Sequence, residues 1–168
     1  MRVNSIQSGV GLIEVLVAVL LLSVAVLGFS ALQLRAISAT DESLVRTQAL
    51  SVIRGLAENM RANSRQIDTY QTTINNAAAQ SITCPNGQCN AEQIAINESK
   101  AAFDQLKNRG VDMRMVTCPG TANFSEVKCV IAAWGDTVPA MDVADPKACA
   151  DASGIYRSGS SCIIVETY

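Results

Sequence analysis

The chain has 168 residues, no histidine and a formal net charge of −2. The lack of histidine removes the commonest general base and the commonest metal ligand, and the small charge removes a general electrostatic attraction to nucleic acid. Apolar residues make up 49% of the chain and are densest near the N-terminus, so we expect one membrane segment followed by one domain.

An apolar run occupies residues 10–34 and contains a single charged residue, Glu14. As a helix with a rise of 1.5 Å per residue, it would span roughly 37 Å, which exceeds the ~30 Å hydrocarbon core of a bilayer. The polar leader of residues 1–9 ends directly before the run, whereas an ordinary secretory signal ends in a small-residue site after it. Arg2 in the leader favours a cytoplasmic N-terminus. We therefore expect a single-pass membrane protein with its C-terminal part outside the cytoplasm.

Glu14 is expected to have a positive partner, because a carboxylate inside a membrane helix costs about 2.5–3.5 kcal/mol on insertion scales. If the chain is cut after Gly9, Val10 supplies a new amine four residues before this carboxylate. The amine of a neighbouring subunit would satisfy it equally and would fix the axial register between helices. The alternative is that Glu14 lies close enough to the interface to stay hydrated.

Gly9 and the following residues 10–18 (VGLIEVLVA) resemble the prepilin signature shared by type IV pilins and type II secretion pseudopilins. The resemblance implies cleavage after Gly9 by a prepilin peptidase, methylation of the new N-terminal residue Val10, and subunit docking through Glu14. Val10 departs from the Phe or Met of most members, which leaves the efficiency of methylation open.

A second set of short segments is similar to PilV-type minor pilins, also called type IV pilus modification proteins: residues 27–28 (LG), 32–33 (LQ), 46–49 (RTQA) and 58–63 (ENMRAN). This resemblance implies a structural subunit that helps to initiate and assemble the pilus. Its partners would be the major pilin and other minor pilins, and it would pass from the inner membrane into the filament, with the tip as one place for it. A minor pseudopilin of a type II secretion system shares this N-terminus and stays open, as does a membrane-anchored adhesin or DNA-binding module.

Helical spacing of apolar residues extends the membrane helix over residues 35–62, the expected periplasmic continuation. The apolar stripe consists of Val45, Ala49, Val52, Ile53, Leu56 and Met60. The stripe should pack on a C-terminal domain formed by residues 63–168. In this domain, residues 63–97 read as a loop with room for one short helix, and residues 99–109 as a helix with Phe103 and Leu106 facing inward, ended by Gly110.

Three strands are predicted after this helix, over residues 111–117, 127–134 and 161–168. The second is apolar on both faces except at Lys128, so it should be the central strand. Residues 119–126 and 135–160 are predicted to be loops. These elements predict an α+β fold, the pilin fold, in which a long N-terminal membrane and amphipathic helix packs on a small antiparallel sheet.

All six cysteines lie in the C-terminal half: Cys84, Cys89, Cys118, Cys129, Cys149 and Cys162. Their even number indicates disulfides in an oxidising compartment. The sequence contains no CxxC motif, the usual sign of zinc binding or thiol redox chemistry. We predict the sequential pairs Cys84–Cys89, Cys118–Cys129 and Cys149–Cys162. Residues 85–87 can turn the chain within the first pair, and a hairpin would join the second. The rival pairing links Cys129 to Cys162 and Cys118 to Cys149.

No catalytic site, cofactor, metal or small-molecule substrate is expected, and a Ser or Cys hydrolase would lack its histidine base. Four acidic loop residues could bind calcium but do not have EF-hand spacing: Asp136, Asp142, Asp145 and Asp151. The thirteen Lys and Arg residues are scattered, so no nucleic-acid partner is expected.

Overall fold

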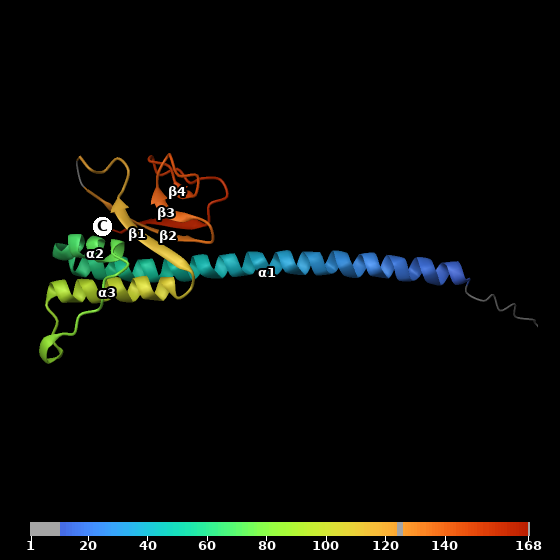
Figure 1. The fold of residues 1–168 in the computed structure, drawn as a ribbon, viewed down its shortest axis with the longest axis horizontal. Coiled ribbons are helices and arrows are strands. Elements are labelled where there is room, and N and C mark those ends of the chain that lie inside the picture. Colours follow the sequence, from blue (N-terminus) through green and yellow to red (C-terminus); the bar gives the residue numbers. More distant parts are fainter. Residues whose placement is uncertain (1–10, 124–125, 168) are drawn as a thin grey trace, which may run out of the picture. The chain divides into compact units, whose positions relative to one another are not determined.

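The structure, a computed structural model, describes residues 11–123 and 126–167. Its first element is helix α1 (Leu12–Ala62), which agrees with the prediction of a helix that continues to about residue 60. The chain divides into two compact units between Ser43 and Leu44, and α1 contributes residues to both (Figure 1). The predicted leader and Val10 lie outside the described residues.

Two helices follow α1, and the second begins earlier than the sequence-based assignment. A short 3-10 turn, η1 (Ser64–Gln66), leads into α2 (Ile67–Asn75), and a second, η2 (Pro85–Gly87), precedes α3 (Ala91–Lys107). Helix α2 is ordered by burial of one face, since Ile67, Tyr70 and Ile74 recur at helical spacing and are all buried. Helix α2 is thus the one short helix for which the predicted loop over residues 63–97 left room, whereas the loop prediction is wrong for the first turns of α3.

Helix α3 begins earlier than predicted because Asn90 caps it. The Asn90 side chain accepts a hydrogen bond from the Gln93 N–H (2.8 Å), and the Gln93 side chain accepts one from the Asn90 N–H (3.0 Å). This reciprocal capping box satisfies backbone donors that a helix start leaves unpaired. The predicted inward residues fit the observed helix, because Leu106 is fully buried and Phe103 packs against the core.

The main sheet has three antiparallel strands: β1 (Val111–Thr117), β2 (Lys128–Trp134) and β5 (Cys162–Glu166). Their order is β1-β2-β5, which confirms that the second predicted strand is central. The alternation predicted for β1 is also confirmed, because Val111, Met113 and Met115 are buried and the residues between them are exposed.

A second, parallel pair of strands was not predicted. Strand β3 (Val138–Met141) pairs with β4 (Ala148–Ala150) inside the segment 135–160, so this part of the predicted loop is wrong. Strand β4 has only three residues, too few for alternation to be recognised. All three are buried, and Cys149 is tied to β5 through Cys162. Long-range packing rather than local pattern therefore defines this pair.

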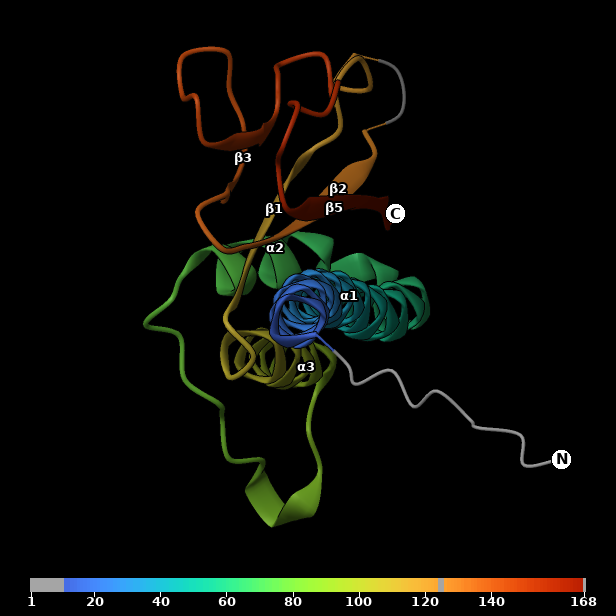
Figure 2. The ribbon, with the colours of Figure 1, turned by 90° about the vertical axis from the view of Figure 1, so that its right-hand side faces the viewer.

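The core of the second unit lies between the helices and one face of the sheet, with α2 against β1 (Figure 2). Helix α1 contributes four buried residues to it, Ala49, Ile53, Leu56 and Met60, all from the predicted stripe. A smaller cluster on the opposite sheet face contains Ile131, Ala133, Cys149 and Cys162. Apolar packing on both faces is what orders this small sheet.

The six cysteines are paired sequentially, in agreement with the first of the two predicted schemes. The Cα–Cα distances are 4.8 Å for Cys84–Cys89, 5.1 Å for Cys118–Cys129 and 5.9 Å for Cys149–Cys162. The last two bridges are buried, whereas the first closes a partly exposed loop. Asn97 fastens that loop to α3, since its amide donates to Ile82 O (2.9 Å) and accepts from Ile82 N–H (2.7 Å).

Candidate functional site

The N-terminal part of α1 presents an exposed apolar surface. The large aliphatic side chains between Leu12 and Leu34 are at least half exposed in the isolated chain. The apolar segment reaches a mean hydropathy of 2.8, and by length and composition the helix is suited to cross a membrane. Exposed apolar surface of this extent is costly in water, so lipid or other helices are expected to cover it.

The hydroxyl groups on this part of α1 are satisfied within the helix. Each donates to the carbonyl four residues earlier: Ser23 to Val19 (2.7 Å), Ser30 to Val26 (2.9 Å), Ser38 to Leu34 (3.0 Å) and Thr40 to Ala36 (2.8 Å). Because these bonds use up the hydroxyl donors, the serines and threonine can face an apolar medium without an added cost.

Glu14 lies in the first turn of α1, next to the positive end of the helix dipole, which favours a carboxylate there. Its N–H donates to Gly11 O (2.9 Å). Its carboxylate has no hydrogen-bond or ion-pair partner among the described residues. A shallow depression on the same helix is formed by Glu14 with Val15, Ala18, Val19 and Leu22. The structure therefore places one unpaired acid on an apolar helix surface. Gly9 and Val10 lie outside the described residues.

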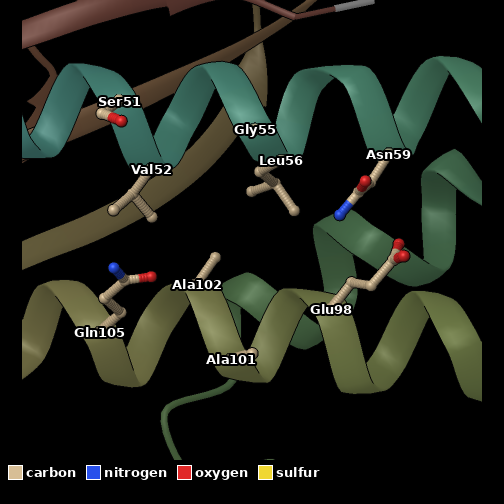
Figure 3. A pocket seen from close by; sticks show the side chains of 9 residues that line it. All are labelled: Ser51, Val52, Gly55, Leu56, Asn59, Glu98, Ala101, Ala102 and Gln105. Carbon is tan, nitrogen blue, oxygen red and sulfur yellow. The ribbon is translucent and has the colours of Figure 1, made fainter.

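A groove of about 350 Å³ runs between α1 and α3 in the second unit. Figure 3 shows Val52 and Leu56 of α1 pointing toward α3, and Ala102 of α3 pointing back. Among the nine residues that line it, Glu98 is the only titratable one. The lining therefore holds no pair of groups that could act as nucleophile and base.

Glu98 is already engaged by a buried tyrosine. The Tyr70 hydroxyl donates to Glu98 Oε2 across the α2–α3 contact. Burial, followed by the hydrogen bond and the negative charge of Glu98, raises the pKa of Tyr70 above its usual range. Tyr70 thus remains a neutral donor at any physiological pH, and the pair joins α2 to α3. Sequence reasoning missed this pair, because nothing in the local pattern links two residues so far apart.

The acidic loop residues considered for calcium act locally instead. Asp142, Asp145 and Asp151 accept hydrogen bonds from backbone N–H groups two residues onward, and Asp151 accepts a second from Ile155. Such bonds stabilise turns. Asp136 is exposed in the turn after β2. Within residues 11–123 and 126–167, no group of three or more His, Cys, Asp and Glu side chains is placed to hold a metal ion.

Comparison with known proteins adds one finding. Residues 31–106 match the model of a family described as Tt1218-like, type IV pilin Tt1218. This span contains the C-terminal part of α1, all of α2 and nearly all of α3. No curated protein and no solved structure matches the chain. With the apolar helix, the small antiparallel sheet and the three bridges, the family match supports a type IV pilin-like structural subunit.

Proposed function

We propose that the protein is a minor pilin that helps to initiate and assemble the type IV pilus. A prepilin peptidase in the inner membrane cleaves it after Gly9 and methylates Val10. The mature chain then leaves the membrane with its exposed apolar helix packed against the helices of the major pilin and other minor pilins. The periplasmic domain determines which partner subunit the chain binds.

The proposal rests on one observation, which is that the Glu14 carboxylate is unpaired within the described part of the chain. Glu14 is the only charged side chain in the apolar run, and it has no partner among the residues described. A carboxylate costs about 2.5–3.5 kcal/mol at the centre of a membrane helix on insertion scales, so selection for membrane insertion alone would remove it. A positive group from outside the isolated chain is the natural partner, and the amine of a processed neighbouring subunit supplies one in an apolar surrounding.

The experiment compares three chains expressed in a strain that lacks the native protein. Glu14→Val should insert into the membrane at least as well as wild type and fail to enter filaments. The second variant combines Glu14→Ala with Ala18→Glu, which moves the carboxylate by one helical turn, about 6 Å, along the same face. It should also fail, since the charge is kept but its axial register is lost.

Surface pili and secreted enzymes are scored separately for each chain. Loss of pili alone supports the minor-pilin role. Loss of secreted enzymes alone would instead identify a minor pseudopilin of a type II secretion system. Full piliation by Glu14→Val would show that the carboxylate is not needed for docking.

A further inference from the structure

The two outer edges of the three-stranded sheet differ in how their outward backbone groups are hydrogen-bonded. At the β1 edge, the Met115 N–H donates to Asn75 Oδ1 (3.0 Å) and the Asn75 amide donates to Met115 O (2.8 Å). The Asn75 side chain thus imitates the next strand, and α2 covers this edge. Native sheets commonly close their edges in such ways, because unpaired strand backbone invites pairing with another chain.

Among the residues that the structure describes, the β5 edge is covered only in part. Trp134 N–H donates to Ser161 O (2.9 Å) and Thr167 N–H donates to Lys128 O (2.9 Å), so the odd-numbered residues of this segment face β2. Backbone direction alternates along an antiparallel strand. The N–H and C=O groups of Cys162, Ile164 and Glu166 therefore point away from the sheet. Figure 2 shows β5 at the margin of the sheet, beside the C-terminal end.

One of these outward groups is occupied. The Ile164 N–H donates to the Tyr156 hydroxyl (2.8 Å), which ends the open part of the edge on that side. Cys162, further along, is buried. Among the residues that the structure describes, the Ile164 C=O and both the N–H and the C=O of Glu166 have no partner. Ile164 is half-buried and Glu166 is exposed, so these groups can be reached.

The Ile164 C=O and the Glu166 N–H together suit an added parallel strand. In parallel pairing, one partner residue donates its N–H to the residue before its opposite number and accepts from the residue after it. A partner residue opposite Val165 would use the Ile164 C=O and the Glu166 N–H in this way. Antiparallel pairing centred on Ile164 would need its N–H as well, and Tyr156 already holds that group. Antiparallel pairing centred on Glu166 would use the two backbone groups of that residue, and its next hydrogen-bonded pair would meet the same occupied N–H.

A groove of about 280 Å³ borders this edge and indicates the side chains that an added strand would carry. Its lining includes the side chains of Pro119, Met141, Tyr156 and Ile164, and its only charged side chain is Glu166. Side chains that lie opposite each other on adjacent strands contact directly. The partner residue opposite Ile164 should therefore be apolar, and the one opposite Glu166 should be basic.

We propose that the β5 edge binds an extended segment of a partner protein as an added parallel strand. The segment pairs with the Ile164 C=O and the Glu166 N–H, and it carries an apolar and a basic side chain on either side of the paired residue. Backbone bonds of this kind supply affinity, and the flanking side chains supply specificity. The proposal does not depend on the pilus role and can be tested without filament assembly.

The probe is the acetylated and amidated peptide Thr-Val-Thr-Lys-Thr, added to the isotope-labelled full chain in detergent micelles. Hydrogen exchange of the Glu166 amide should slow when the peptide binds, whereas the Val165 amide, which faces β2, should change little. The matched control peptide carries an N-methyl group on the central Thr. It keeps every side chain but cannot donate to Ile164, and it should bind about ten-fold more weakly.

A matched pair of protein variants tests the acceptor side. Glu166→Pro removes the outward N–H at an edge position, where proline is tolerated, and Glu166→Ala keeps it. The alanine variant should still protect its residue-166 amide, and the proline variant should bind about ten-fold more weakly than the alanine variant. Equal binding of the two peptides, binding without slower exchange at Glu166, or no binding at millimolar peptide would each overturn the proposal.

Discussion

Replacement of Asn75 by alanine tests how much the closed β1 edge contributes to folding. The Asn75 amide makes two hydrogen bonds with the backbone of Met115, and both are short and partly buried. A hydrogen bond of this kind contributes about 1 kcal/mol net, and a buried group left unpaired costs about as much again. Asn75→Ala should therefore lower the free energy of unfolding by about 2 kcal/mol.

The assay is urea denaturation of the full chain in micelles. Trp134 is the only tryptophan of the chain and packs against the core at the end of β2, so its fluorescence reports on this unit. Asn108→Ala is the control, because Asn108 is exposed and its side chain makes no hydrogen bond among the residues described. The control should stay within about 0.5 kcal/mol of wild type. If Asn75→Ala does the same, the edge bonds do not stabilise the fold and the contrast between the two sheet edges loses its energetic basis.

Three further predictions concern processing, a bridge and acid sensitivity. Gly9→Val should leave an uncut precursor, and mass spectrometry that finds a mature N-terminus in this variant would contradict cleavage after Gly9. Replacing both Cys149 and Cys162 by alanine should cost about 3 kcal/mol of unfolding free energy in the chain-entropy model, measured by the same urea assay, and peptide mapping without reduction should recover the sequential pairs. The hydrogen bond and charge of Lys128, with a hydrogen bond from the Thr117 hydroxyl, hold the pKa of Glu126 below its usual range. The stabilisation of the folded state that results is fully present above the ordinary carboxyl pKa, and it is lost as pH falls through the lowered pKa. Glu126→Gln should therefore flatten the acid side of the stability profile, and an unchanged profile would show that the pair does not stabilise the fold.

The predicted elements that proved right are those whose residues carry their own pattern. Strand β1 has apolar side chains at every second position from Val111 to Met115, and β2 is apolar on both faces. Helix α1 combines an uninterrupted apolar run with a helical stripe that ends at Met60. In each case the buried positions of the element are marked by its own apolar residues, so the local sequence contains the signal.

The elements that were not predicted, or whose position was not predicted, depend on partners that are distant in the sequence. Helix α2 is short, and its three buried residues are ordered by α3 and β1. Strand β4 is held by β3 and a disulfide. The start of α3 was predictable, because an Asn followed three residues later by a Gln is a capping signal.

Of the two candidate sites, one could be predicted from the sequence and the other could not. Glu14 stands out in the sequence because a lone charge in an apolar run needs no structure to be noticed. The open edge of β5 could not be predicted, because it requires the strand order, the direction of each backbone group and the position of the Tyr156 hydroxyl.

The placement of the bridges has a mechanical consequence. All three disulfides lie between Cys84 and Cys162, and none includes a residue of α1. Once the packing of α1 on the core has separated, a pulling force applied to α1 would reach the cross-linked region through residues 63–83, which contain α2. Fully extended, this segment could lengthen to roughly 70 Å. The protein thus combines a cross-linked region that resists extension with a short segment that contains no cross-link. Reducing the disulfides would therefore leave the first stage of its stretching unchanged.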